Sequence, residues 1–399
     1  GNTANDYWQG LINGKSGAAP ITKFDAEKFR TKFACEVKNL DVESFIDRRQ
    51  ARRLDLFTQL AIIAADEAVQ SSGLDIEQID LNRAGVIFGS GIGGLRTLEE
   101  EIAGFAVGNG TPRYNPFLIP KMISDIAAGH ISIKYGFRGV NYATVSACAS
   151  SSHAISNAFD YIRLGRADIV ISGGSEASVT TTAIGGFNAM KALSTRNDDP
   201  KTASRPFDKD REGFVLGEGA GVLVLEEYEH ARNRGARIYA EIVGSGATAD
   251  AHHITAPHPE GLGARNVMQM ALNDAKMNPG DIDYVNVHGT STPLGDIAES
   301  KAILEVFGDH AYQLNISSTK SMTGHLLGAA GAIEAIAGIL AIDQSFVPPT
   351  INHFTDDPEI DSRLNFTFNE AQERSVRAVL SNTFGFGGHN SSLIFKQLS

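Results

Sequence analysis

A cysteine and two histidines, each placed where a short patterned run ends, carry the most reactive groups of this sequence. Cys148 follows the β-favouring run 141–145, His288 follows the apolar run 283–287, and His325 follows the polar stretch 317–324. A thiolate can accept an acyl group from a thioester, and a neutral imidazole can stabilise a developing oxyanion or enolate. Brought together, the three side chains would suit acyl transfer through a covalent thioester.

Small residues surround Cys148, and an amphipathic helical pattern follows it. We therefore expect the cysteine at a strand-to-helix turn, where the helix N-terminus favours the thiolate and lowers the thiol pKa. Free backbone N–H groups at the same turn could bind an oxyanion. Taken alone, the segment favours the interpretation of a buried, inert cysteine. Cys35 has no comparable surroundings and keeps that second interpretation.

The two histidines are expected at the edges of sheets. His288 would project at the carboxyl end of a strand, where α/β proteins bind ligands. His325 would lie near the start of an Ala/Gly-rich helix, whose N-terminus disfavours imidazolium and keeps the ring neutral. Lys320 is either a solvated lysine or an electrostatic support for His325, and Glu334, which interrupts an apolar helix face, would be its partner. Each histidine alone is more often a hydrogen-bonded structural residue.

Alternating strand and helix patterns predict an α/β fold with largely parallel strands. Apolar runs that end in glycines are typical of buried strands, and helical patterns cover 57–71, 151–164, 264–276, 293–307 and 326–342. The order of strand, corner, helix and strand around Cys148 recurs around 320–325. We interpret this as an internal duplication that packs two βαβ-rich halves around central sheets. Coincidence among common βα units is the alternative.

Composition excludes several classes of protein. The 399 residues are 42% hydrophobic and 21% charged, and the formal net charge of −12 argues against a nucleic-acid binder that relies on overall basicity. The two cysteines suit neither a disulfide framework nor a zinc site, so we expect no metal and a reducing, cytoplasmic compartment. No stretch approaches the roughly 20 uninterrupted apolar residues of a membrane helix, so we expect no membrane association.

Four blocks of sequence resemble the thiolase-fold condensing enzymes, and specifically the β-ketoacyl-[acyl-carrier-protein] synthases of types I and II. In chain order they are 145–151 (VSACASS), 287–293 (VHGTSTP), 319–325 (TKSMTGH) and 382–388 (NTFGFGG). The resemblance covers almost the whole chain and implies a thiolase-like fold, two duplicated halves in the layers α-β-α-β-α. The first half, 1–240, would carry the nucleophilic cysteine and inserted cap segments, and the second, 241–399, both histidines.

By this resemblance the chain is an acyltransferase of fatty acid elongation. It would condense a Cys148-bound acyl chain with malonyl-[acyl-carrier protein] and release 3-oxoacyl-[acyl-carrier protein] and CO2. His288 and His325 match the residues that promote decarboxylation, and Lys320 supports them. The resemblance further assigns an oxyanion hole and gatekeeper at Phe384 and Phe386, phosphopantetheine contacts at Thr290 and Thr292, an entrance loop at Asp250 and His253, and a supporting carboxylate at Glu334.

The runs 326–331 (LLGAAG) and 347–352 (VPPTIN) are more similar to type II than to type I synthases. A type I synthase, a polyketide-type ketosynthase or an accessory decarboxylase subunit is the alternative, although an accessory subunit would lack the thiol. A thiolase-like enzyme acting on free coenzyme A thioesters is a third class. Family members usually begin with a strand before the position of Asn2, roughly a dozen residues not found here, so we expect the first sheet to be incomplete.

The resemblance also implies partners. Acyl- and malonyl-loaded acyl carrier protein is strongly acidic in this family, so an acidic enzyme needs a local positive docking site. The basic run 47–53 supplies one, with a solvated helix face as its alternative, and the expected docking residues are Arg49, Arg52, Arg53 and Lys191. We further expect a homodimer with the strand before the nucleophile at its interface, and no cofactor beyond the phosphopantetheine that the carrier protein brings.

Overall fold

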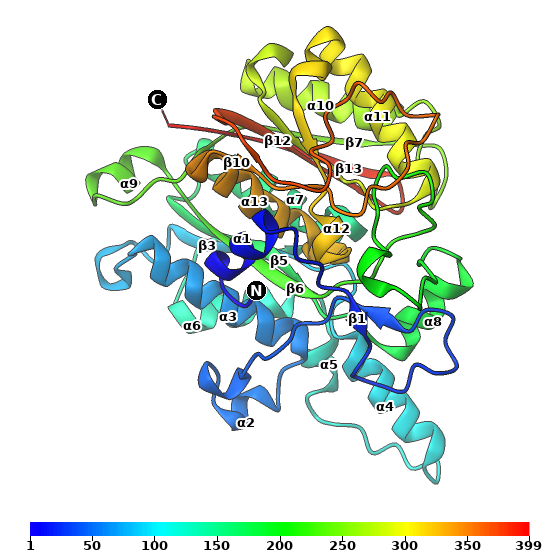
Figure 1. Ribbon diagram of the computed structural model, residues 1–399. Coiled ribbons are helices and arrows are strands. Elements are labelled where there is room, and N and C mark those ends of the chain that lie inside the picture. The colour runs from blue at the N-terminus through cyan, green and yellow to red at the C-terminus, as the bar shows by residue number, and fades with distance from the viewer. Residues whose placement is uncertain (399) are drawn as a thin grey trace.

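The computed structural model describes residues 1–398 and contains two main sheets, one from each half of the chain (Figure 1). The first sheet has the order β4-β3-β5-β6, formed by β3 (Ala84–Gly89), β4 (Asn141–Thr144), β5 (Ile169–Glu176) and β6 (Gly219–Glu226). The second has the order β7-β13-β12-β8-β9, formed by β7 (Glu241–Ala249), β8 (Tyr284–Asn286), β9 (Asn315–Ser317), β12 (Ala378–Gly385) and β13 (His389–Lys396). Short pairs join β1 (Ala19–Pro20) to β2 (Phe33–Ala34) and β10 (Phe346–Val347) to β11 (Gln372–Glu373).

The order of the strands shows the internal duplication directly. With β7 set aside, β9-β8-β12-β13 repeats β4-β3-β5-β6. In both sheets the first three of these strands are parallel and the last is antiparallel. The duplicated halves predicted from the sequence are therefore confirmed, and parallel pairing is confirmed for the strands that end at the candidate site.

One difference between the halves lies at the sheet edges. β7 covers the outer edge of β13, whereas the outer edge of β6 has no strand partner within residues 1–398. A cavity of about 1290 Å³ runs along that edge of β6, walled by α1 (Ala4–Ile12) and α3 (Leu56–Ser72). The first sheet thus has one strand fewer than the second.

Helices complete the five layers α-β-α-β-α, which confirms the predicted thiolase-like architecture. The outer face of the first sheet carries α3 and α6 (Ile126–Tyr135), the outer face of the second carries α10 (Leu262–Ala275) and α11 (Pro293–Phe307), and α7 (Ser150–Arg163) and α13 (Ala330–Gln344) lie between the sheets. All five helical patterns found in the sequence correspond to these helices. One apolar cluster lies at the outer face of each sheet, and a third fills the central layer between the sheets. The sheets therefore divide the main core into three parts.

The central helix α13 is apolar on nearly every side because protein surrounds it. With the preceding turn it forms the one helical stretch among residues 1–398, Leu327–Gln344, that is long and apolar enough to be considered as a membrane span. Its mean hydropathy is 1.4, but 72% of it is buried inside the protein, as in the core helix of a soluble protein. Its small residues permit close packing, since a side chain at Gly338 would lie 3.0 Å from Val379.

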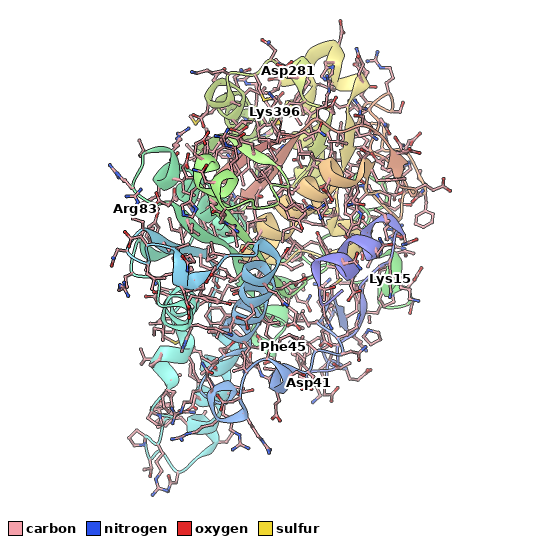
Figure 2. The ribbon with its side chains drawn as sticks, turned by 90° about the vertical axis from the view of Figure 1, so that its left-hand side faces the viewer. Lys15, Asp41, Phe45, Arg83, Asp281 and Lys396 are labelled. Atoms are coloured by element: carbon pink, nitrogen blue, oxygen red, sulfur yellow. The ribbon has the colours of Figure 1, made fainter. Side chains whose placement is uncertain are left out.

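Segments that lie, in chain order, between the strands and helices of the layers form a cap on the first half. They contain α2 (Arg48–Ala51), α4 (Leu95–Val107), α5 (Leu118–Met122) and α8 (Thr181–Ala189), while α9 (Tyr228–Asn233) links the two halves and α12 (Lys320–Thr323) precedes α13. Figure 2 shows the elongated arrangement: Asp281 and Lys396 of the second half lie at one end, and Asp41 and Phe45, which lead into α2, lie toward the other.

Candidate active site

Cys148 lies on a single 3₁₀ turn, η3 (Ala147–Ala149), that joins β4 directly to α7. The turn is sharp, because Ala147 adopts a positive φ of +50°, a conformation that L-residues rarely occupy. β3 packs directly against the turn, because a side chain at Gly89 would lie only 2.5 Å from the backbone of Ser150. The strand-to-helix turn predicted for Cys148 is confirmed, and the thiol is 6% exposed.

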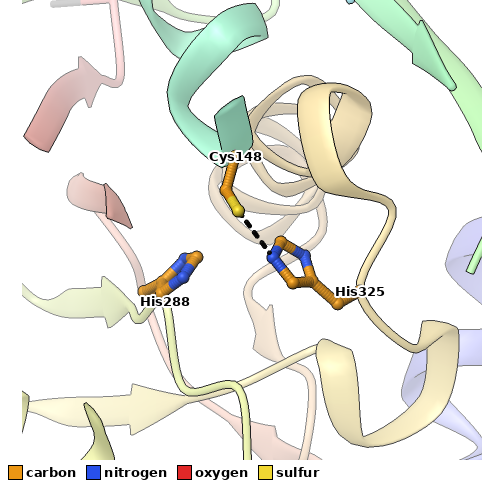
Figure 3. A group of neighbouring side chains, drawn as sticks. All are labelled: Cys148, His288 and His325. Atoms are coloured by element: carbon orange, nitrogen blue, oxygen red, sulfur yellow. Dashed lines mark hydrogen bonds between the residues drawn. The ribbon is translucent and has the colours of Figure 1, made fainter. Parts of the chain in front are cut away.

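The structure brings Cys148, His288 and His325 together (Figure 3). The Nε2 atom of His325 lies 3.0 Å from the Sγ atom of Cys148. The two imidazole rings are perpendicular, with an interplanar angle of 87° and centroids 5.3 Å apart. One ring nitrogen of each histidine and the sulfur all lie within 4.8 Å of one another. Residues separated by as many as 177 positions therefore surround one point.

Burial, and not the helix N-terminus, dominates the acidity of the thiol. Burial raises the pKa of Cys148 to about 11, while Lys320 and the backbone N–H groups of Phe386 and of Cys148 itself act in the opposite direction. The expectation of a lowered thiol pKa was therefore wrong. The resting group is a neutral thiol, and it needs a proton acceptor when it attacks a thioester. His325 Nε2 is within hydrogen-bond distance to accept that proton.

Both imidazoles are neutral, as predicted, but chiefly for a different reason. Burial lowers the pKa of His288 and of His325 well below the usual range, and the Lys320 ammonium lowers both further. The expected helix-terminus effect is thus secondary to desolvation. Within residues 1–398, the Nδ1 atoms of both rings are buried without a hydrogen-bond partner. No hydrogen bond at Nδ1 therefore fixes the tautomer of either ring within residues 1–398.

Lys320 and Glu334 form a buried ion pair, which confirms the pairing expected from the sequence. Lys320 is 1% exposed at the start of α12, and Glu334 is 1% exposed on α13. The Lys320 ammonium donates to Glu334 Oε1. Burial raises the pKa of Glu334 to about 7 even though Lys320 opposes that shift. The pair places a fixed positive charge beside the two imidazoles.

The turn between β12 and β13 closes the site from the second sheet. The backbone N–H of Phe386 lies against the thiol and favours its ionised form. The Phe384 ring lies 5.6 Å from the His288 ring, centroid to centroid. A side chain at Gly385 would lie 2.9 Å from the Ser146 carbonyl oxygen, so the turn packs directly on the Cys148 corner. The two phenylalanines predicted at the site are therefore in place.

The predicted substrate-contact residues follow β8 and β7. The hydroxyl oxygens of Thr290 and Thr292 are 2.9 Å apart, directly after His288 in the chain. In the loop after β7, Asp250 accepts a hydrogen bond from Asn390 at 2.8 Å, and its backbone N–H donates to Gly388 at 2.9 Å. This loop is thereby fastened to the turn that carries Phe386. His253 is exposed in the same loop.

The predicted docking residues are exposed but do not form one continuous element. Arg49 lies on α2, and Arg52 and Arg53 directly follow it. The Arg53 guanidinium lies 4.9 Å over the ring of Phe117, next to α5. Lys191 is exposed in the turn after α8, a separate segment of the cap.

Two buried glutamates at the site were missed by the sequence analysis. Glu299 on α11 accepts the backbone N–H groups of His288 and Gly289, at 2.9 and 2.8 Å. Glu176, the last residue of β5, accepts three backbone N–H groups near Cys148. Both carboxyl groups have a pKa raised to about 7 by burial. For Glu176 the available signal was a single charged residue within a stretch of apolar and small residues, the kind of signal that drew attention to Glu334, whereas Glu299 stands near Asp296 and Lys301 and gave no such signal.

The cluster of one thiol and two imidazoles is compact enough to hold a metal ion. Its surroundings suit a cation poorly. The Lys320 ammonium is close enough to lower the pKa of both imidazoles, and it would repel a metal. Histidines that bind metals usually donate their second ring N–H to a carboxylate or carbonyl group, and neither Nδ1 atom here has such a partner within residues 1–398. The arrangement suits acyl chemistry better.

Comparison with known proteins agrees with this geometry. The family model "Beta-ketoacyl synthase, N-terminal domain" matches residues 1–231, and "Beta-ketoacyl synthase, C-terminal domain" matches residues 239–354. Proteins named 3-oxoacyl-[acyl-carrier-protein] synthase 2 from Synechocystis sp. (strain ATCC 27184 / PCC 6803 / Kazusa) and Staphylococcus aureus (strain COL) are 48% and 51% identical, over 100% of this chain and 95% of each relative. A type II polyketide ketosynthase solved in complex with its acyl-carrier protein, bound to the hexaketide, is 33% identical with a TM-score of 0.89 and covers 100% of this chain and 96% of its own.

Removal of the Lys320 ammonium is expected to destabilise the fold strongly. Lys320→Met leaves the Glu334 carboxyl buried without its partner, which costs about 3–5 kcal/mol in the free energy of unfolding. Denaturant unfolding measures this cost. Arg96→Ala, which breaks the exposed pair with Glu100, is the control and costs less than about 1 kcal/mol. The double variant Lys320→Met/Glu334→Gln recovers part of the loss. Equal costs for the two single variants would contradict the importance of the buried pair.

Proposed function

The chain belongs to the β-ketoacyl synthase family, and from that premise we propose how its residues divide the reaction among themselves. The chain is an acyltransferase of fatty acid elongation. It condenses an acyl chain with malonyl-[acyl-carrier protein], and the products are 3-oxoacyl-[acyl-carrier protein] and CO2. The observation that supports the assignment of roles is the 3.0 Å contact between His325 Nε2 and Cys148 Sγ, with His288 beside both.

The first half-reaction loads the enzyme. Cys148 Sγ attacks the thioester carbonyl of the incoming acyl carrier, and His325 Nε2 accepts the thiol proton. The oxyanion of the tetrahedral intermediate is held by the backbone N–H groups of Cys148 and Phe386, which already lie beside the sulfur. When the intermediate collapses, the carrier thiol leaves with the proton. The acyl group then remains on Cys148 as a thioester.

The second half-reaction forms the carbon–carbon bond. The malonyl group loses its carboxylate as CO2, and the electron pair of the broken bond passes into an enolate of the thioester. His288 and His325, both neutral, donate N–H groups to the enolate oxygen without releasing a proton to the carbon. His325 Nε2 accepted and then returned the thiol proton during loading, so the ring takes its Nε2–H tautomer for this step, which the unpartnered Nδ1 permits. The enolate carbon attacks the Cys148 thioester, and the same two backbone N–H groups hold the oxyanion. Collapse expels the Cys148 sulfur as a thiolate, which takes up one proton from solvent, because the original thiol proton left with the first carrier.

The neighbouring residues would bind the carrier arm and gate the site. Thr290 and Thr292 present adjacent hydroxyls at the end of β8, where a phosphopantetheine arm could accept and donate hydrogen bonds. Phe384 and Phe386 lie on the turn that closes over His288 and Cys148. The Asp250 loop is fastened to that turn, so the loop and the turn would open together. The chemistry needs no cofactor other than the carrier's own phosphopantetheine.

We also propose a homodimer in a cytoplasmic setting. β4, the strand before Cys148, pairs only with β3 within residues 1–398, so its outer edge offers unpaired backbone groups. Apolar side chains near this edge are exposed, Ile133 at 80% and Val145 at 60%. An edge strand flanked by exposed apolar residues would be covered by a second copy of the chain.

Intact-protein mass spectrometry tests the assignment of the nucleophile. After incubation with a medium-chain acyl carrier protein, the wild type gains the mass of one acyl group, and malonyl carrier protein then discharges it as a 3-oxoacyl product. Cys148→Ala forms no adduct because its side chain has no sulfur, whereas Cys35→Ala, which removes the other buried thiol, loads normally. Malonyl decarboxylation without an adduct in the wild type would favour the accessory-subunit alternative.

Charge reversal tests the docking surface on α2. Arg52→Glu/Arg53→Glu is expected to raise the apparent KM for carrier-bound substrates about tenfold or more at low salt, because an acidic carrier protein would meet negative charge. The value of kcat changes little. Arg363→Glu, which reverses an exposed arginine paired with Asp361 in the second half, is the matched control and leaves the KM unchanged. An unaltered KM in the α2 variant would place docking elsewhere.

Sedimentation tests the dimer. The wild type is expected to sediment as a dimer at micromolar concentration. Val145→Arg places a charge beside the β4 edge and shifts the protein toward monomers. Leu164→Arg alters an equally exposed side chain, at 61%, at the far end of α7, and it leaves the dimer intact. A monomeric wild type would rule out the proposed interface.

A further inference from the structure

The corner that opens α13 repeats the Cys148 corner in detail. Ala147 and Leu327 both have positive φ, +50° and +48°, and each begins a single 3₁₀ turn that runs directly into a central helix. The second of these turns is η7 (Leu327–Ala329). Gly328 therefore occupies, in the second half, the position that Cys148 occupies in the first. Both positions present a backbone N–H at a helix N-terminus, which favours a negative charge.

The two equivalent N–H groups have different occupants. The backbone N–H of Cys148 lies beside the thiol, where the oxyanion of the substrate would form. That of Gly328 donates to Glu176 Oε2 at 3.0 Å. The same oxygen accepts the N–H of Gly91 at 2.8 Å, and Oε1 accepts the N–H of Ile92 at 3.2 Å. The carboxyl group of Glu176 thus occupies the second anion site.

Glu176 joins two segments that both contact the Cys148 corner. Gly91 and Ile92 belong to the loop after β3, and Gly328 lies three residues after His325. A side chain at Gly91 would lie 3.3 Å from the Gly328 nitrogen and 3.4 Å from the Ala147 carbonyl oxygen. The loop is therefore packed between the two corners, and the hydrogen bonds that Gly91 and Ile92 donate to Glu176 hold it there.

Glu176 is fully buried, and no cation of the protein pairs with it in these contacts. Burial raises the pKa of Glu176 to about 7 against the three N–H groups and Ser178. The folded state therefore binds this proton more tightly than the unfolded chain, so stability is lost as the pH rises from about 4.5 to about 7 and does not return at higher pH. A charged carboxylate is thus kept at a stability cost, which is typical of functional sites.

We propose that Glu176 is a positioning residue: its carboxylate fastens the loop after β3 to the corner that carries His325, and thereby sets the contact between His325 and Cys148. Glu176 itself touches neither reacting atom. The proposal depends on the proposed function only through the catalytic roles of Cys148 and His325. The positional part can be measured on the thiol without any condensation reaction.

The charge of Glu176 supplies a readout that a purely structural role would not move. Above pH 7 the carboxylate is ionised, and it opposes the thiolate of Cys148. The other groups that act on this thiol are the Lys320 ammonium, which is paired with Glu334, and the backbone N–H groups of Phe386 and Cys148. The neutral His288 and His325 rings lie beside it. Replacing Glu176 with glutamine removes its negative charge and changes the charge of none of these groups. The thiol should then ionise at lower pH.

The experiment compares Glu176→Gln with the wild type by iodoacetamide alkylation across pH, with peptide mass spectrometry counting modification at Cys148. Glu176→Gln is expected to shift the alkylation profile to lower pH by about half a unit or more. In the condensation assay, its kcat falls about tenfold or more with little change in KM, since a small misplacement of a catalytic group is costly. The melting temperature is expected to change little, because removal of a costly buried charge offsets the loss of one acceptor: the amide nitrogen of glutamine cannot accept the backbone N–H that a carboxylate oxygen accepted.

The matched control is Glu218→Gln, a buried carboxyl whose pKa is also raised by burial but which pairs with Lys23 and accepts the N–H of Val37. It is expected to leave the alkylation profile and kcat unchanged. An unshifted profile in Glu176→Gln, or a kcat that falls only together with the melting temperature, would overturn the proposal. A shifted profile in protein that performs no condensation would uphold the charge effect and reject the proposed function instead.

A second variant provides an independent test of the proposal if Glu176→Gln does not fold. Ser178→Ala removes a hydroxyl that donates to Glu176 Oε1 at 3.3 Å, and it retains the charge. Loss of this donor raises the pKa of Glu176 further, so a larger fraction of the protein loses the carboxylate at pH 6.5. The ratio of kcat at pH 6.5 to kcat at pH 8 is expected to fall about two- to threefold below the wild-type ratio. An unchanged ratio would argue against the role of the carboxylate.

Discussion

Two helix N-termini, those of α7 and α13, meet between the sheets, and the rest of the site depends on how their partial positive charges are satisfied. Duplication of the fold makes such a meeting inevitable, because each half delivers a corner and a central helix to the same layer. Two equal sites would leave two anion-binding points facing each other. The protein resolves this with the Cys148 thiol at one corner and the Glu176 carboxyl group at the other, so that a single corner remains available for the substrate.

Burial then determines the protonation of nearly every group around that corner. The thiol and both imidazoles are neutral because water is excluded, and Lys320 restrains the shift of the thiol while it reinforces the shift of the imidazoles. Neutral rings can donate hydrogen bonds to an enolate without quenching its carbon. The same exclusion of water makes Lys320 dependent on Glu334 and leaves three glutamates with a pKa near 7. The site is thus organised by desolvation, with paired and hydrogen-bonded charges as its supports.

The elements of the fold were largely predictable because their patterns are strong. The apolar runs around 85–89 and 169–174, and the five long helical patterns, all appear as buried strands and layered helices. The reactive residues were predictable for a related reason, since each marks a break in such a pattern. Glu176 and Glu299 escaped notice because their partners are backbone N–H groups, which no side-chain motif reveals. The dominant influence on the thiol was also misjudged, because the degree of burial is not a local property.

The sequence by itself indicated the fold class and the duplication, since these depend on local periodicity and on the order of the elements. It also determined the family and the identity of Cys148, His288, His325 and Lys320, since these depend on four sequence motifs. Only the tertiary structure decided the separations of these groups, their protonation, and the exchange of a thiol for a glycine and carboxylate at the equivalent corner. Those properties arise from segments hundreds of residues apart packing together and excluding water. Desolvation and Coulomb interactions depend on three-dimensional distance, which sequence order does not specify.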